Sequence, residues 1–238
     1  MKGDLMREER FYIGAVPAIL YGAPADRGYL FLHGQMGRKE EARAFAQVVC
    51  PGGFQVLSID LPGHGARQDR GEELFPWTAA PDIRASLDFA KHRWNTVSLR
   101  ATSIGAYIAL LAFDAPERAL LVSPVLDMEA LIQTMMGWAG VSEKQLREQG
   151  EIAAPSGQTL SWRYLCWVRE HPIWSWSCPI HILYGSEDAL ISRQTVEAYA
   201  RQHSASLTVM EGGEHWFHTP EQTAFLRQWE TVSSLPDS

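Results

Sequence analysis

The stretch Leu99-Arg-Ala-Thr-Ser-Ile-Gly-Ala-Tyr107 decides the fold of this chain. Its first residues end a predicted strand, Thr96 to Ala101, and a predicted helix follows from Ile104 to Phe113. Ser103 stands at the junction, with an alanine two positions before it and a glycine two positions after it. A serine on so tight a strand-to-helix turn requires small neighbours. The pattern predicts an activated serine; the alternative interpretation is an ordinary helix N-cap, which serine also favours.

The same alternation of strand and helix continues on both sides of this turn. Further strands are predicted at Arg10–Ile13, Val16–Tyr21, Tyr29–His33, Gln55–Ile59, Leu120–Val125, Pro179–Tyr184 and Ser206–Met210. Further helices are predicted at Arg38–Val49, Ala80–Arg93 and Pro220–Val232. Such alternation is typical of a parallel sheet covered by helices on both faces. We therefore expect an α/β fold with a mostly parallel, eight-stranded sheet.

One segment, residues 126–178, departs from this alternation. It shows no clear strand and holds five of the nine tryptophans. Helical pieces are predicted at Met128–Trp138, Ser142–Gln149 and Leu160–Arg169, with a break at Pro155-Ser-Gly157. We interpret 126–178 as a helical cap inserted into a core made of residues 1–125 and 179–238.

Charge and cysteine content exclude several classes of protein. The chain has 238 residues and a formal net charge of −7, without a basic stripe, so we expect no nucleic-acid partner. Its three cysteines are Cys50, Cys166 and Cys178; they are widely spaced and odd in number, which favours neither a disulfide framework nor a zinc site.

The N-terminal residues predict neither a signal peptide nor a membrane span. Met1 to Glu9 is charged, and the apolar stretch from Phe11 to Tyr21 is broken by Gly14 and Pro17. We expect a cytoplasmic protein, and we make no prediction of its oligomeric state.

Four further motifs follow predicted strands. In chain order they are His33-Gly-Gln-Met-Gly37, Asp60-Leu-Pro-Gly-His-Gly65, Tyr184-Gly-Ser-Glu-Asp188 and Gly212-Gly-Glu-His215. Together with the serine turn, and in this order, they resemble the α/β-hydrolase family, in particular its small serine hydrolases of the carboxylesterase and serine aminopeptidase branches. The resemblance covers most of the chain apart from the cap.

The resemblance implies a catalytic triad. Ser103 would be the nucleophile, His215 the general base and Asp188 the acid that orients the histidine. Glu187 is the alternative acid and His218 the alternative base. This chemistry needs neither a metal nor an organic cofactor, and we predict none.

The resemblance also assigns the oxyanion hole. In the family, backbone N–H groups stabilise the negative charge that develops on the substrate carbonyl. The matching residues here are Gln35 and Ile104. The loop from Asp60 to Gly65 is interpreted as structural, with its glycines needed for the turn.

The expected partner is a small-molecule ester with a small or medium acyl group or an aromatic group. Met135, Met136 and Trp138 are the candidates for lining its pocket, although core packing is the simpler interpretation of such residues. A lysophospholipase-type enzyme and a non-catalytic ligand-binding protein remain alternatives. So does an aminopeptidase, whose substrate amine would need carboxylates; the cap offers Glu129, Glu143, Glu148 and Glu151.

Overall fold

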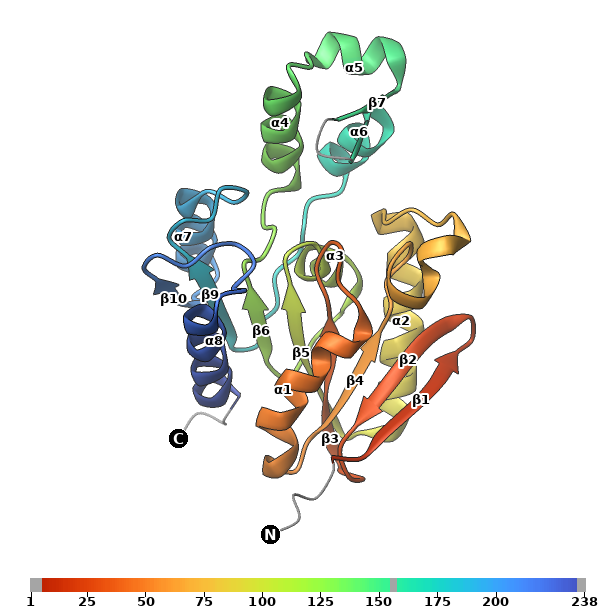
Figure 1. Cartoon of the computed structure of the whole chain (residues 1–238), viewed down its shortest axis with the longest axis vertical. Coiled ribbons are helices and arrows are strands. Elements are labelled where there is room, and N and C mark those ends of the chain that lie inside the picture. Colours follow the sequence, from red (N-terminus) through yellow and green to blue (C-terminus); the bar gives the residue numbers. More distant parts are fainter. Residues whose placement is uncertain (1–5, 155–157, 235–238) are drawn as a thin grey trace.

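The computed structural model describes residues 6–154 and 158–234. Its main feature is an eight-stranded sheet with the strand order β1-β2-β4-β3-β5-β6-β9-β10 (Figure 1). The strands are β1 (Glu8–Ile13), β2 (Val16–Tyr21), β3 (Arg27–Leu32), β4 (Gln55–Ile59), β5 (Thr96–Thr102), β6 (Ala119–Val122), β9 (Ile180–Gly185) and β10 (Ser206–Met210). Strand β2 is antiparallel to both β1 and β4, and the remaining pairs are parallel. The predicted fold class is confirmed.

Burial explains why the central strands are mostly apolar. All five residues of β4 and all four of β6 are buried, as expected for strands covered on both faces. Edge strand β1 instead mixes exposed and half-buried residues.

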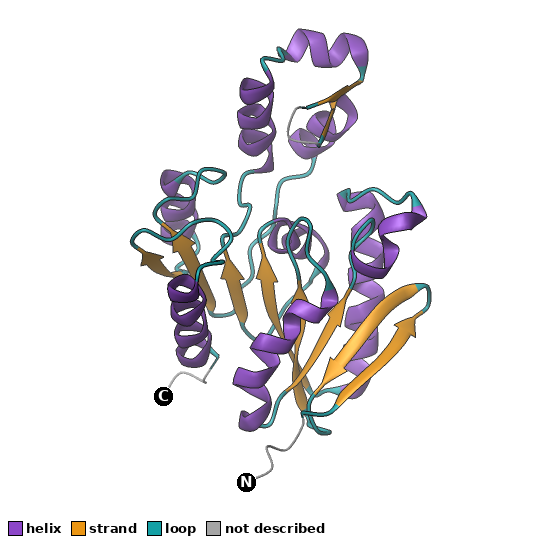
Figure 2. Cartoon of the chain, viewed as in Figure 1, coloured by secondary structure: helices purple, strands orange, loops and turns teal. Residues whose placement is uncertain are grey.

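Helices cover both faces of the sheet, as Figure 2 shows. Helices α1 (Ala42–Val49) and α8 (Pro220–Ser233) contact each other over one face. Helices α2 (Pro76–Arg93), α3 (Ile104–Ala112) and α7 (Arg193–Gln202) contribute to the core on the other face. Short 3-10 helices at Lys39–Glu41, Cys50–Gly52 and Gly65–Arg70 complete the connections.

Two helices differ from the sequence prediction. Helix α2 begins at Pro76, four residues before the predicted start, because proline fits the first turn of a helix. Helix α7 was not predicted, because few of its residues are apolar; Val196, Tyr199 and Ala200 are its buried positions.

The segment between β6 and β9 projects beyond the carboxyl ends of the parallel strands (Figure 1). We call residues 126–178 the cap. It contains α4 (Met128–Ala139), α5 (Glu143–Gln149), α6 (Trp162–Glu170) and a hairpin of β7 (Glu151–Ala153) and β8 (Thr159–Ser161). The expectation that the cap has no strand was wrong, since strands of three residues carry no readable periodicity. The predicted break at 155–157 lies outside the described residues.

None of the helices within residues 6–154 and 158–234 is both long and apolar enough to cross a membrane.

Candidate active site

Ser103 lies on the turn between β5 and α3, at the carboxyl edge of the sheet. Its backbone has φ = 50° and ψ = −120°, a conformation that costs energy for any residue other than glycine. Strand β6 and the loop after it hold this turn. The Ser103 N–H donates to the carbonyl of Val122 (3.0 Å), and the Val125 N–H donates to the Ser103 carbonyl (3.3 Å). A strained residue fixed by its surroundings is typical of functional sites.

The loops after β9 and β10 bring two further side chains to the serine. Nε2 of His215 lies 2.9 Å from Oγ of Ser103, and Nδ1 of His215 lies 2.7 Å from Oδ2 of Asp188. The other carboxylate oxygen, Oδ1, accepts backbone N–H groups from Leu190 (2.9 Å) and Ile191 (3.0 Å). The Asp188 side chain is fully buried and the His215 side chain is 3% exposed, so the chain of contacts is shielded from water.

This arrangement fixes the tautomer of His215. A carboxylate next to Nδ1 accepts the ring proton from that nitrogen. Nε2 then carries a lone pair and accepts the hydroxyl proton of Ser103. The geometry can therefore transfer a proton from Ser103 to His215 while Asp188 stabilises the resulting imidazolium.

Glycines allow the two loops to approach each other. A Cβ on Gly185, at the end of β9, would lie 2.3 Å from the carbonyl oxygen of Gly213, in the loop after β10. The N–H of Glu187 also donates to the Gly213 carbonyl (2.8 Å). This contact joins the loop that carries Asp188 to the loop that carries His215.

The two alternative triad residues lie outside this cluster. The Glu187 residue is exposed, whereas its neighbour Asp188 contacts His215. The side chain of His218 is 62% exposed and its Nδ1 lies 3.2 Å from a carboxylate oxygen of Glu214.

A tight turn at 34–37 lies beside the serine. The N–H of Gly37 donates to the Gly34 carbonyl (3.1 Å), and Met36, with φ = 63°, occupies the left-handed position of this turn. A Cβ on Gly34 would lie 3.3 Å from the Cβ of Ser103. The structure thus places Gln35 immediately after a residue that touches the serine. Ile104, the other predicted N–H donor, is the first residue of α3, where the N–H has no partner within the helix.

His33 holds this turn in place as a neutral ring. Its Nδ1–H donates to the Gly34 carbonyl (2.8 Å), and the Leu61 N–H donates to Nε2 (3.1 Å). Burial lowers the pKa of His33 to about 4, so the ring remains uncharged at neutral pH.

The loop after β4 is stabilised by a buried carboxylate. Asp60 accepts from the Lys39 ammonium (2.6 Å) and from the N–H groups of Lys39 (2.9 Å) and Ala66 (3.0 Å). His64 donates from Nδ1 to the carbonyl of Pro62 (2.7 Å). A Cβ on Gly65 would overlap the Asp60 carboxylate at 2.2 Å, which explains the glycine. These contacts agree with a structural role for the loop.

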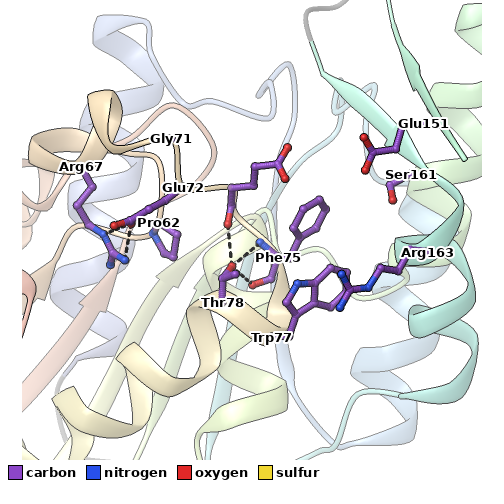
Figure 3. Close-up of a pocket in the computed structure, with 11 residues that line it drawn as sticks. Pro62, Arg67, Gly71, Glu72, Phe75, Trp77, Thr78, Glu151, Ser161 and Arg163 are labelled. Carbon is purple, nitrogen blue, oxygen red and sulfur yellow. Dashed lines mark hydrogen bonds and ion pairs between the residues drawn. The ribbon is translucent and has the colours of Figure 1, made fainter.

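A pocket of about 460 Å³ lies between this loop region and the cap (Figure 3). Phe75 and Trp77 stack in one wall, with ring centroids 4.6 Å apart. On the cap side, the Arg163 guanidinium lies over the Trp77 ring at 4.6 Å, and Glu151 lines the pocket nearby. The full lining is Pro62, Arg67, Gly71, Glu72, Glu73, Phe75, Trp77, Thr78, Glu151, Ser161 and Arg163.

The three predicted substrate-binding residues lie elsewhere on the cap, on α4. Met136 is 6% exposed and packs in the core, Met135 is half-buried, and Trp138 is 59% exposed. None of the three lines the pocket of Figure 3.

The sequence analysis did not single out the aromatic residues where α2 meets the cap. The Tyr164 ring meets Phe75 edge-on at 5.3 Å and Trp77 at 5.8 Å, and Trp77 meets Trp167 at 5.7 Å. The two large rings Phe75 and Trp77, at the N-cap and in the first turn of α2, were the available signal.

Within the described ranges, no group of three or more histidine, cysteine, aspartate or glutamate residues is arranged to hold a metal ion.

The solved structures that resemble this chain include several hydrolases. Est1E from Butyrivibrio proteoclasticus, solved with ferulic acid bound, has a TM-score of 0.77 and 16% identity, covering 94% of this chain and 96% of its own. A putative hydrolase from Agrobacterium vitis S4 has a TM-score of 0.73 and 20% identity, covering 94% of this chain and 97% of its own. The Pyrococcus furiosus esterase Pf2001 has a TM-score of 0.65 and 14% identity, with 96% and 92% covered. At these identities the likeness concerns the fold.

The sequence comparisons give a clear assignment at the level of the family. The search of curated proteins returned no match. A family model described as the alpha/beta hydrolase family, however, matches residues 29–228. That range contains the serine turn and the loops of Asp188 and His215, and it includes most of the chain. The chain therefore belongs to the alpha/beta hydrolase family.

Proposed function

We propose that this protein is a serine hydrolase that cleaves carboxylic esters. The observation that carries the proposal is the contact of His215 Nε2 with Ser103 Oγ at 2.9 Å, with Asp188 at 2.7 Å behind the ring. A serine hydroxyl is a weak nucleophile at neutral pH unless a base accepts its proton. Here the base, its orienting carboxylate and the strained serine turn occur together.

The proposed reaction has two steps. Ser103 Oγ attacks the ester carbonyl while His215 takes its proton, and the protonated ring then gives that proton to the leaving alcohol. The acyl group remains on Ser103 until a water molecule attacks it and gives a proton to His215; the bond to Oγ then breaks, the carboxylic acid leaves, and His215 returns the proton to Ser103. All the reacting groups on the enzyme side belong to the chain itself.

We assign the oxyanion hole to the N–H groups of Gln35 and Ile104. The Gly34 contact with Ser103 supports the position of Gln35, and the helix start supports that of Ile104. The positive end of the α3 dipole favours the same negative charge. Donors fixed before the reaction stabilise the charge without reorganisation.

The substrates we propose have a small or medium acyl group or an aromatic group. Phe75 and Trp77 stack in the pocket between α2 and the cap, and this supports an apolar or aromatic substrate. The lining also includes five charged side chains and none of the three triad residues. Est1E, which has a similar fold, was solved with ferulic acid bound, and this also favours an aromatic ester.

Labelling with a fluorophosphonate tests the activated serine. We expect one adduct, located at Ser103 by mass spectrometry, that is lost in Ser103→Ala and strongly slowed in His215→Ala. A panel of alkanoyl and aryl esters then tests the substrate class. The ester proposal fails if no ester is cleaved faster by the wild type than by Ser103→Ala.

An aminopeptidase is the second candidate, and one observation favours it. Glu151, one of the four cap carboxylates considered, lines the pocket together with Glu72 and Glu73. Glu129 and Glu143 instead pair with Arg169. Hydrolysis of aminoacyl-naphthylamides that is abolished in both Ser103→Ala and Glu151→Gln would support this candidate over the esterase.

A further inference from the structure

Two tyrosine hydroxyls are buried without a partner between the serine turn and the cap. Tyr107, on α3, is 1% exposed, and Tyr164 lies on cap helix α6. Both hydroxyl oxygens are enclosed, and neither has a hydrogen-bond partner within the described part of the chain. Buried polar groups in proteins are almost always paired with protein, water or ligand. Tyr21 and Tyr199 also have buried hydroxyls without a partner among the described residues. Tyr107 and Tyr164 differ from them because one lies on the helix that begins at the nucleophile and the other on the cap, so this pair points to a ligand of the enzyme.

Tyr107 stands one helical turn from the nucleophile. It follows Ser103 by four residues, and side chains on a helix lean toward its N-terminus, so the Tyr107 ring leans toward the serine end of α3. One turn further on, Leu111 lines a second cavity, of about 440 Å³, together with Trp77 and Trp167. This face of α3 therefore lies below the contact between α2 and the cap.

Tyr164 approaches the same place from the cap. Its ring is held edge-on by Phe75 and Trp77, which also line the pocket of Figure 3. The α3 face that carries Tyr107 and the Tyr164 ring both lead to Trp77: Leu111, one turn beyond Tyr107, lines a cavity with Trp77, and the Tyr164 ring meets Trp77 at 5.8 Å. Negative charge on Tyr107 would also raise the pKa of Tyr164. Burial raises the pKa of both phenols, and both remain neutral hydrogen-bond donors across the physiological range.

We propose that the hydroxyls of Tyr107 and Tyr164 together bind a hydroxyl group on an aromatic ring of the ester substrate. This inference rests on the proposed ester hydrolysis and names its substrate class. Two neutral phenols, one of them packed against aromatic rings, suit a neutral, ring-borne hydroxyl, because each can donate to it or accept from it. An ionised substrate group would need an opposite charge, which neither phenol supplies. Both oxygens are enclosed and neither tyrosine lines the two cavities described above, so the proposal includes a movement of α6 away from Phe75 and Trp77 that admits the ring.

The first test measures binding and does not depend on turnover. It uses Ser103→Ala and compares 4-ethylphenol with ethylbenzene, which differ by one hydroxyl. We expect the phenol to bind about 10-fold more tightly or better, since a site built to bond a hydroxyl discriminates against the analogue that lacks it. Adding Tyr107→Phe or Tyr164→Phe should reduce this ratio to about threefold or less. Equal affinities of the two ligands for Ser103→Ala would overturn the proposal.

The second test measures kcat/KM on two matched pairs of esters. One pair carries the ring on the acyl side (methyl 3-(4-hydroxyphenyl)propanoate and methyl 3-phenylpropanoate). The other carries it on the alcohol side (2-(4-hydroxyphenyl)ethyl acetate and 2-phenylethyl acetate). We expect the wild type to prefer the hydroxylated member of one pair by about 10-fold or more. Tyr107→Phe and Tyr164→Phe should remove this preference and leave the other member within about threefold.

Tyr199→Phe is the matched control, because it removes a buried phenol hydroxyl from α7 and should leave the preference unchanged. Equal losses of kcat/KM on both members of a pair in Tyr107→Phe or Tyr164→Phe would indicate a merely structural role, such as holding a water molecule, and would overturn the inference. If Ser103→Ala discriminates between the two ligands but the wild type cleaves no ester, then the proposed function fails and the hydroxyl recognition stands. If the wild type cleaves esters without preferring the hydroxylated member of either pair, the proposed function stands and the hydroxyl recognition fails.

Discussion

Gly105 and His33 meet backbone to backbone: a Cβ on Gly105 would lie 2.4 Å from the carbonyl oxygen of His33. Helix α3 therefore begins in direct contact with the end of β3. This contact brings the serine turn next to the Gly34–Gly37 turn, and any side chain at position 105 would separate them. The glycine two residues after Ser103 is thus required by packing between two loops as well as by the sharpness of the turn.

Gly105→Ala should consequently impair both stability and activity. Overpacking of this kind costs about 1–3 kcal/mol, and each kcal/mol lowers the melting temperature by about 2–4 °C in a chain of this size. Gly137→Ala is the control, because a Cβ there, in the last turn of α4, meets nothing within 4 Å. Alanine should stabilise that helix by up to about 1 kcal/mol. Calorimetry on both variants measures the difference, and equal melting temperatures would contradict the predicted contact.

Asp188→Asn should abolish most of the hydrolytic activity while Glu187→Gln leaves it unchanged. An amide in place of the carboxylate cannot fix the His215 proton on Nδ1 or stabilise the imidazolium, and in a comparable triad the loss is about 10⁴-fold in kcat. Glu187 is exposed and does not contact the ring, so its charge should matter by less than about twofold. The measurement is kcat on the best ester substrate. A larger loss in Glu187→Gln would reverse the assignment of the acid.

Local patterns in the sequence predicted most of the secondary structure, and what they missed has no local pattern. The strand Gln55–Ile59 was predicted with its observed bounds, because buried strands of a mostly parallel sheet are largely apolar. The hairpin β7–β8 was missed because its strands are too short to show a period.

Contacts between distant segments were harder to predict than the elements themselves. The residues at 103, 188 and 215 were expected to meet because each follows a strand, and parallel strands bring their carboxyl ends to one edge. Tyr107 and Tyr164 gave no comparable signal. Their relation to one another depends on how the cap packs against α2, and no local pattern encodes that packing.

Stability should fall in mild acid because of His33. Its pKa is about 4 in the folded protein and 6.5 when exposed, so between these values only the unfolded chain binds the proton. The free energy of unfolding should therefore decrease as pH falls from 6.5 to 4, by up to about 3 kcal/mol, and this contribution should be constant below pH 4.

Urea denaturation of wild type and His33→Gln between pH 7.5 and 4 tests this prediction. The difference in stability between the two proteins should shrink as the pH falls, because the variant lacks the titrating ring. A difference that does not change with pH would show that another group causes the acid sensitivity. Carboxylates such as Glu230, whose pKa is raised by burial, act in the opposite direction and are present in both proteins.

Glu230→Gln should destabilise the fold through an ion pair behind the serine turn. Nε of Arg100, on β5, lies 2.9 Å from the Glu230 carboxylate on α8, and both residues are buried. Removing one partner of a buried pair costs about 3–5 kcal/mol. We expect a cost at the lower end of this range, because Glu41 also attracts the Arg100 guanidinium that loses its partner.

The double variant Arg100→Met/Glu230→Met separates the lost pair from the lost packing. Apolar replacement of both partners leaves no uncompensated charge, so it should be less destabilising than Glu230→Gln alone. Urea denaturation gives the comparison. A double variant that is less stable than the single variant would mean that the pair itself, rather than the buried charge left behind, determines the cost.

Arg169→Gln should loosen the cap without unfolding the core. From α6 the Arg169 guanidinium bonds Glu129 of α4 (2.7 Å) and Glu143 of α5 (2.8 Å), so one side chain joins the three cap helices. These groups are substantially exposed, and surface ion pairs contribute little to global stability. Their loss should instead appear as local opening, which hydrogen exchange detects where a melting curve does not. We expect faster amide exchange in described cap helices 128–149 and 162–170 and a nearly unchanged melting temperature.

Arg193→Gln breaks a comparable exposed pair with Glu197 on α7 and should leave cap exchange as it is. Slower hydrolysis in Arg169→Gln alone would show that the closed cap contributes to substrate binding, whereas equal exchange in both variants would mean that aromatic contacts with α2 hold the cap by themselves.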